Sequence, residues 1–165
     1  MAVSYPAILS AMMNYNAGDP KRIQHALKVF AYASLIGEAE GLDSRTLDIL
    51  KTAAALHDIG IHSAEKLHGS SAGQWQEVEG PPVARKLLAP FGFDAAFTER
   101  VCFLIGHHHT YGAVDGPDYQ ILLEADLLVN CYEDDVAPET ARRVGKKLFR
   151  TKTGREFFLA LLPQE

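Results

Sequence analysis

The chain has 165 residues, with 21 acidic and 16 basic side chains and a formal net charge of −5. This excess of negative charge argues against binding extended nucleic acid, whose phosphates need a broad basic surface. No segment approaches the roughly 20 apolar residues of a membrane span, and residues 1–6 lack the basic start and apolar centre of a secretory signal. We expect a cytoplasmic protein with one domain over residues 1–165.

The two cysteines, Cys102 and Cys131, lie in helical apolar patterns. Buried free thiols are commoner than a lone disulfide in an intracellular protein, so the sequence predicts that both stay unpaired.

The first third of the chain predicts three helices. Residues 4–14 are amphipathic and are expected to form a short helix that braces the domain. Asp19 and Pro20 give a strong helix start, since an N-cap oxygen precedes proline at the first helical position. This second helix continues to about residue 40, and its apolar face is flanked by His25. A third helix is capped by Asp43 or Ser44.

The third helix ends in small apolar residues, 52–56, followed by His57, Asp58, Ile59 and Gly60. Small side chains allow a neighbouring helix to approach closely, and Gly60 suits the left-handed residue that ends many helices. The helical stripe that includes Ala54 points His57 inward. Two structural alternatives remain open at this stage. Asp58 could act as a cap or pair with Lys51, and His57 could favour the helix C-terminus through the dipole.

Residues 61–76 lack a clear helical pattern and predict a polar loop near the mouth of a site. His62, Lys66 and His68 in this loop could reach a phosphate, although a solvated role is favoured for them. A helix is then expected from Gly80 to Leu88, with the segment 89–92 ending it.

Asp94 is expected to cap a helix that leads into His107, His108 and His109. The register of this helix points His108 toward the core, with His109 as the second choice and at least one of the three facing away from the site. The sequence leaves open which of these histidines binds metal.

Asp118 is expected to cap a helix over residues 119–132 that places Asp126 among apolar residues. An unpaired buried carboxylate is costly, so Asp126 needs a cation or strong donors, and Asn130 could orient a ligand from the next turn. Basic helices over residues 139–150 and 154–162 follow within the C-terminal segment 138–165. With no strand pattern of useful length, the chain predicts an all-α bundle of seven or eight helices.

The ordered set of His25, the doublet His57 and Asp58, and the distant Asp126 resembles the signature of the HD superfamily of metal-dependent phosphohydrolases. The resemblance extends from about residue 19 to 130 and implies an HD-domain-like helical bundle. It also implies that these four residues bind a divalent metal ion. His57 and Asp58 would be the catalytic pair, and a phosphate ester would be hydrolysed by metal-activated water.

Many two-metal members of this superfamily carry a further histidine shortly before the position of Gly80, whereas this chain has Gln76, Glu77, Val78 and Glu79 there. Glu77, or Glu79, could supply a carboxylate instead. The candidates for a second metal or for substrate binding are Glu77, His108 and His109. One or two ions are expected, and the cofactor could be Mn, Mg, Fe, Co, Ni or Zn.

The predicted function is a phosphomonoesterase or phosphodiesterase for a nucleotide or another small phosphorylated metabolite. Two alternatives remain: a metal-stabilised sensing or binding domain without turnover, and a di-iron oxygenase, which some proteins with the HD fold are. The oxygenase needs a complete second ligand set, which the missing histidine weakens. The sequence names no particular substrate and leaves a homodimer open.

Overall fold

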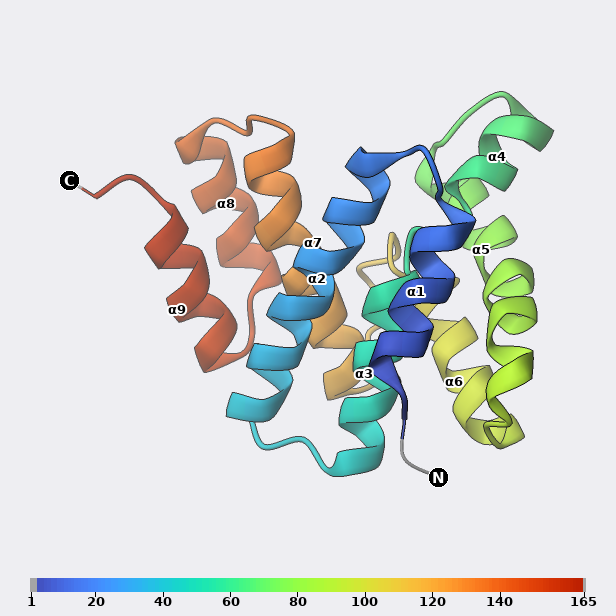
Figure 1. Cartoon of the computed structure of the whole chain (residues 1–165). Helices are drawn as coiled ribbons and strands as arrows, with labels where there is room; N and C mark the ends of the chain where they lie inside the picture. The colour runs from blue at the N-terminus through green and yellow to red at the C-terminus, as the bar shows by residue number, and fades with distance from the viewer. Residues whose placement is uncertain (1–2, 165) are drawn as a thin grey trace.

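The computed structural model describes residues 3–164, and this part of the chain forms nine α-helices and one 3₁₀ turn without any strand (Figure 1). The all-α prediction is confirmed, and the number of helices is close to the expected seven or eight. The elements are α1 (Tyr5–Tyr15), α2 (Pro20–Ala39), α3 (Ser44–Leu56), α4 (Ile61–His68), α5 (Gly73–Leu88), the 3₁₀ turn η1 (Ala89–Phe91), α6 (Ala95–Ile105), α7 (Pro117–Glu133), α8 (Pro138–Leu148) and α9 (Lys152–Leu161).

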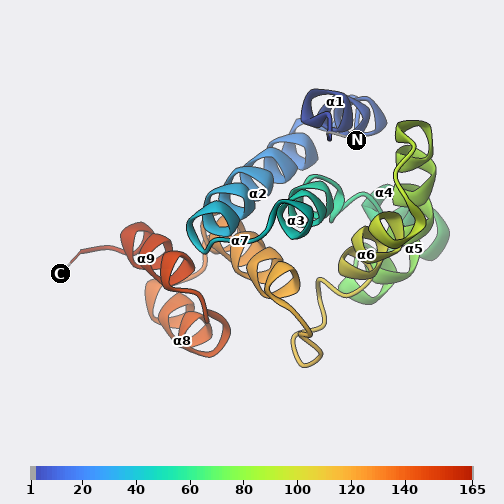
Figure 2. The ribbon, with the colours of Figure 1, turned by 90° about the horizontal axis from the view of Figure 1, so that it is seen from below.

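Helix α3 lies at the centre of the bundle and packs against α1, α2, α6 and α7. Figure 2 shows α2, α3 and α7 in the middle, with α4 to α6 on one side and α8 and α9 on the other. Every residue from Thr52 to Leu56 is buried. The small side chains of this run allow several helices to pack closely around it, as the sequence predicted.

Three of the predicted helix starts are confirmed by hydrogen bonds from aspartate caps. The carboxylate of Asp19 accepts from the Arg22 backbone N–H at 3.2 Å, that of Asp43 from Thr46 at 3.0 Å, and that of Asp94 from Phe97 at 2.9 Å.

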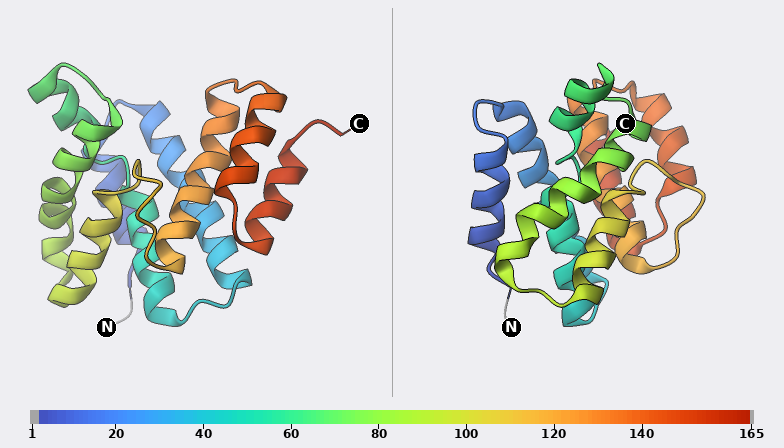
Figure 3. Two further views of the ribbon diagram at one scale, coloured as in Figure 1. Left: turned by 180° about the vertical axis from the view of Figure 1, so that it is seen from behind. Right: turned by 90° about the vertical axis from the view of Figure 1, so that its right-hand side faces the viewer.

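The predicted cap at Asp118 is wrong, because α7 begins at Pro117 and Gly116 occupies the N-cap position. Asp118 is buried within the first turn, where it accepts hydrogen bonds from the Arg100 guanidinium. Arg100 also pairs with Asp115 at 2.7 Å. This ion-pair cluster fixes the segment 106–116, which crosses from α6 to α7 in Figure 3.

The predicted polar loop over residues 61–76 is wrong as well, because residues 61–68 form α4 and α5 begins at Gly73. Helix α4 buries only Ile61 and Ala64, so its apolar stripe is too short to stand out in the sequence. The helix expected from Gly80 begins earlier, at Gly73, so Pro81 and Pro82 lie inside α5.

Gly60 has a different role from the predicted one. Its φ of −80° is right-handed, so it is not a left-handed helix cap. A Cβ atom at Gly60 would lie 2.5 Å from the backbone N of Gly80. The glycine is needed because the turn after α3 passes directly against the backbone of α5, and this contact fixes the turn that carries His57 and Asp58.

Both C-terminal helices were predicted, and they pack beside α7. The two cysteines are free, as expected. Among the described helices, none has both the length and the apolar character that crossing a bilayer requires.

Candidate metal centre

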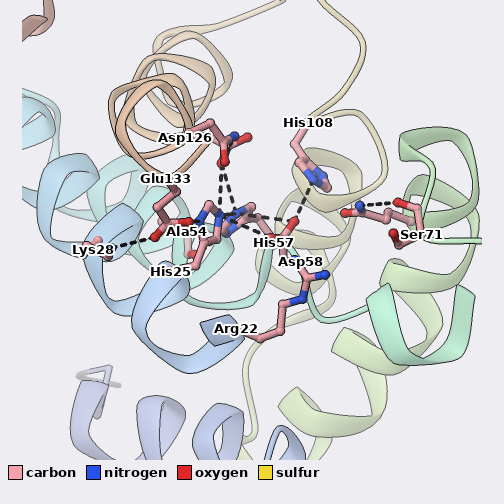
Figure 4. Close-up of polar contacts among 12 residues, drawn as sticks. Arg22, His25, Lys28, Ala54, His57, Asp58, Ser71, His108, Asp126 and Glu133 are labelled. Atoms are coloured by element: carbon pink, nitrogen blue, oxygen red, sulfur yellow. Dashed lines mark hydrogen bonds and ion pairs between the residues drawn. The ribbon is translucent and has the colours of Figure 1, made fainter. Parts of the chain in front are cut away.

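Four residues that lie far apart in the sequence meet between α2, α3 and α7 (Figure 4). His25 comes from α2, His57 and Asp58 directly follow α3, and Asp126 comes from the middle of α7. His25 Nε2 lies 3.2 Å from both Asp58 Oδ2 and Asp126 Oδ1, and His57 Nε2 lies 3.4 Å from Asp126 Oδ1. The structure therefore brings together all four residues that resemble the family signature.

The imidazole tautomers in this cluster are fixed by their outer hydrogen bonds. His57 Nδ1 donates to the backbone carbonyl of Ala54 at 2.8 Å, and His25 Nδ1 lies 2.8 Å from Glu133 Oε2. A carbonyl oxygen only accepts, so the neutral His57 ring keeps its lone pair on Nε2. His25 Nε2 and His57 Nε2 lie 3.0 Å apart, and two lone pairs at that distance need a cation or a proton between them. The residues present therefore fit a divalent ion.

Glu133 and Lys28 form an outer layer that the sequence reading missed. The Glu133 carboxylate bonds His25 and pairs with the Lys28 ammonium at 2.6 Å. Such a carboxylate holds the ring orientation of a metal-binding histidine and increases its basicity. The sequence contains one sign of this role: Glu133 follows Asp126 by two helical turns on α7, so the two carboxylates lie on the same face of the helix.

The centre carries strongly interacting charges. Burial opposes protonation of His57, but the Asp58 and Asp126 carboxylates raise its pKa to about 9. Burial alone would raise the pKa of the Asp126 carboxyl, yet His25 and His57 hold it well below its ordinary range. The predicted role of Asn130 is supported, since its amide donates to Asp126 Oδ1 at 3.0 Å. The cluster is therefore arranged to attract positive charge.

A second group of potential ligands shares Asp58 and adds His108 and His109. His108 Nδ1 donates to the Ile105 carbonyl at 2.7 Å, so its Nε2 lone pair faces inward, 3.3 Å from Asp58 Oδ1. That buried Nε2 has no hydrogen-bond partner among the described residues. Burial and the neighbouring His108 ring lower the pKa of His109 to about 4, which keeps its imidazole neutral and able to bind a metal.

Glu77, the carboxylate considered for a second ion, lies in neither ligand group. Its Oε1 accepts hydrogen bonds from the backbone N–H of His109 at 3.0 Å and from the Thr110 hydroxyl at 2.8 Å, so Glu77 holds the turn after α6. Gln76, near the position of the missing histidine, lies with its Oε1 3.2 Å from His109 Nε2. His107 stacks on Phe103 and bonds its carbonyl.

Two of the three residues considered for phosphate contact, His62 and His68, are paired with other side chains, whereas Lys66 lies in the last turn of α4. His62 lies 3.3 Å from Asp19 Oδ2, while His68 stacks on Trp75 and pairs with Glu79 at 2.9 Å. The alternative partner for Asp58 is also not observed, because Lys51 pairs instead with Glu38.

Arg22 is a further residue that the sequence reading missed. It lies one turn before His25 on α2, and Figure 4 shows its guanidinium directed toward Asp58 without a drawn ion pair. Its guanidinium is a second cation at this centre, in addition to the Lys28 ammonium. Arg22 precedes His25 by three residues, so the two side chains lie on the same face of α2. This spacing is the one sign in the sequence that Arg22 lies near the site.

Comparisons with known proteins agree with this geometry. Residues 22–131 match the HD domain family, which is most of the chain. A solved structure, described as a predicted HD superfamily hydrolase from an uncultured Thermotogales bacterium, is 30% identical in sequence with a TM-score of 0.68. The match covers 94% of this chain and 83% of that one. Among curated proteins, none matches the chain significantly.

The chain belongs to the HD domain family. With its His and Asp clusters and its similarity to an HD superfamily hydrolase, it falls in a superfamily of metal-dependent hydrolases.

Proposed function

We propose that the protein is a metal-dependent phosphohydrolase that cleaves a phosphate ester of a nucleotide or another small phosphorylated metabolite. One observation carries this proposal: three imidazole Nε2 atoms with fixed tautomers converge on two carboxylates, and the guanidinium of Arg22 points toward one of them, Asp58 (Figure 4). With divalent ions bound, such a site would present positive charge to a phosphate dianion, although the whole chain is negative.

We assign one divalent ion to four ligands, His25, His57, Asp58 and Asp126. Asp58 would also bind a second ion, together with His108 and His109. Divalent ions held this way lower the pKa of bound water and neutralise charge on a phosphoryl oxygen. Ligand sets of imidazole and carboxylate suit Mn, Fe, Co, Ni or Zn, with Mg favoured less because it prefers oxygen.

The protein groups around the ions position the substrate. The Arg22 fork would bind two oxygens of the phosphoryl group, as guanidinium groups commonly do with phosphate. Asn130 and Glu133 hold Asp126 and His25 in place, so the ligands need little rearrangement when an ion binds. The backbone contact between Gly60 and Gly80 fixes the turn that carries Asp58.

Metal analysis of the purified protein, followed by a phosphatase screen, tests this function. The metal-free protein would be loaded separately with Mn²⁺, Mg²⁺, Co²⁺, Ni²⁺, Fe²⁺ or Zn²⁺ and assayed for phosphate release from phosphomonoesters and phosphodiesters. We expect hydrolysis that depends on the metal and is abolished by a chelator. A loaded protein that releases no phosphate from any member of the panel would instead be a sensing or binding domain.

The second candidate function is a di-iron oxygenase. The observation in its favour is the second ligand group: His108 and His109 with Asp58 supply a nitrogen and oxygen set although the family histidine before Gly80 is absent. Two bound irons with an optical absorption band, together with oxygen consumption and no phosphate release, would favour the oxygenase.

A further inference from the structure

A cavity of about 300 Å³ lies between the segment after α6 and the helices α7 and α8. Figure 3 shows this segment passing beside α7 in the left-hand view. The wall is mainly apolar, with an aromatic ring on one side and two cationic side chains at the rim. The residues that carry the argument are Tyr111, Leu123, Leu127, Val144, Lys147 and Arg150.

Three residues that line the cavity lie close along the chain to proposed metal ligands, although no ligand itself lines the cavity. Tyr111 follows His109 by two residues, and Leu123 and Leu127 lie within one helical turn of Asp126 on α7. A molecule whose phosphoryl group lies at the metal centre could therefore extend into the cavity.

The cationic rim has no acidic partners among the described residues. Lys147 and Arg150 are exposed, and the one hydrogen bond of the Arg150 guanidinium goes to the Phe149 carbonyl at 3.3 Å. Two unpaired cations at the edge of an apolar cavity, in a chain with a net charge of −5, fit an anionic group better than a cationic one.

The walls of the cavity are anchored. The buried carboxylate of Glu124 accepts from the Thr151 backbone N–H at 2.9 Å, and Gln120 donates to the Leu148 carbonyl at 2.8 Å. These bonds fix the end of α8 against α7. On the opposite side, the Tyr119 hydroxyl donates to the His107 carbonyl at 2.8 Å. The cavity is thus largely formed before a ligand arrives, as small-molecule sites usually are.

We propose that this cavity binds the leaving group of the substrate, and that the leaving group is an alcohol that bears a heterocyclic ring and a second anionic group. The ring would lie against Tyr111 and the apolar side chains of α7 and α8, and the second anion would contact Lys147 and Arg150. This inference rests on the proposed hydrolase function. Hydrolysis breaks the P–O bond to the leaving group and forms one from water, and the departing alcohol takes a proton.

Three substrates test the two parts of this subsite: ribose 5-phosphate, adenosine 5′-monophosphate and adenosine 3′,5′-bisphosphate. All three present a 5′-phosphate to the metal centre. Adenosine 5′-monophosphate adds the heterocyclic ring, and adenosine 3′,5′-bisphosphate adds a second anionic group, the 3′-phosphate. We expect kcat/KM for the 5′-phosphate to rise by roughly tenfold at each step, equivalent to one additional favourable contact.

Variants separate the cationic rim from the apolar wall. Replacing both Lys147 and Arg150 by glutamine should remove the advantage of the bisphosphate and leave the monophosphate unchanged. Glutamine at Arg143 and Lys146 is the matched control, because these cations of α8 do not line the cavity. Val144→Trp fills the cavity and should raise KM for adenosine 5′-monophosphate by about tenfold, with ribose 5-phosphate unaffected.

Binding of the product adenosine 3′-monophosphate, measured by calorimetry, distinguishes the failure of this proposal from that of the hydrolase function. Binding that depends on Lys147 and Arg150, in a protein without phosphatase activity, would support the subsite and overturn the hydrolase function. Hydrolysis of all three substrates at similar rates, unchanged by the rim variants and by Val144→Trp, would overturn the subsite and leave the hydrolase function standing.

Discussion

The two ligand groups of the metal centre are built from different kinds of structure. His25 and Asp126 project from the interiors of two long helices, α2 and α7, which pack closely against each other. His108 and His109 are consecutive residues in a turn. That turn is held from outside, by the Glu77 carboxylate on the backbone of His109 and by the Tyr119 hydroxyl on that of His107.

His57 and Asp58 also lie in a turn, but the close contact of Gly60 with Gly80 fixes it. The difference therefore concerns the outer ligands: His25 and Asp126 keep their geometry without metal, whereas His108 and His109 depend on the conformation of a turn. Helix packing is lost only in cooperative unfolding, while a turn can shift at much lower cost. We therefore expect the ion at the first group to bind more tightly than the ion at the second.

The largest loss of metal and of activity is expected on replacing Asp58, the residue that the two groups share. Asp58→Ala should remove both ions and reduce phosphate release by at least about a thousandfold, since metal activation contributes several kcal/mol. His57→Ala should likewise remove metal and activity together. Elemental analysis and an initial-rate assay measure the two losses, and His68→Ala serves as the control that retains metal. Stoichiometric metal in the Asp58 variant would contradict the assignment.

Loss of the second group alone should have a smaller effect. His108→Ala is expected to reduce metal content from two ions to one and to lower kcat by about a hundredfold, with the first ion retained. His107→Ala is the matched control, because its ring stacks on Phe103 outside either group. Equal metal content in the His108 variant and in the wild-type protein would show that this histidine binds no ion.

The sequence identified the first group because each of its members lies in or directly after a helical apolar pattern. Periodicity fixes the direction of a side chain on a helix, so His25, His57 and Asp126 could be placed on inward faces. The same reasoning supported His108, which follows α6 in register. It could not decide the roles of His107 and His109, because the turn after α6 does not continue the helical spacing.

Other parts of the site could not be read in this way. Arg22 and Glu133 are charged residues near helix ends, where solvent exposure is the usual outcome, and only the packing of α2 against α7 brings Glu133 to His25. The sequence of the segment 61–76 predicts a loop because α4 buries just two side chains. The close contact between α5 and the turn after α6, which involves Glu77, was therefore not visible in the sequence.

Arg22 offers a test of substrate binding that leaves both ligand groups intact. Arg22→Gln should lower kcat/KM for a phosphomonoester by about ten- to a hundredfold, because a charged contact with phosphate contributes about 1.5–3 kcal/mol. Metal content should not change. Arg22→Lys keeps the charge without the planar fork and should recover part of the loss. A variant with unaltered kinetics would place the phosphoryl group elsewhere.

Proton binding should affect the first group in the metal-free protein. The pKa of His57 is raised from 6.5 to about 9, so its contribution to stability is complete below pH 6.5 and is lost as the pH rises toward 9. This contribution is of the order of 3 kcal/mol. The Tm of the metal-free protein should therefore fall by several degrees across that range. In the metal-loaded protein the ion replaces the proton, and a slope of the same size there would contradict this account.

The smallest effect is expected from Gly73, which leaves room for the second group. A Cβ atom at this position would lie 2.7 Å from Cγ of the His109 ring, so Gly73→Ala must displace that imidazole. Alanine is otherwise favourable in a helix, and a loss of function would then come from His109 rather than from α5. We expect roughly tenfold weaker binding of the second ion, measured by metal titration, with the first ion unchanged.

Gly112→Ala is the matched control for this change, because a Cβ atom there meets nothing within 4 Å. If Gly73→Ala weakened the binding of both ions equally, a shift of His109 would also disturb the first group. The two groups would then not bind their ions independently, and the contrast between them would be wrong. If it weakened neither, His109 would not bind the ion, and Asp58 and His108 would need another partner. A selective loss of the second ion would establish that the fit of α5 against a turn, rather than the helical core, limits how many ions this centre holds.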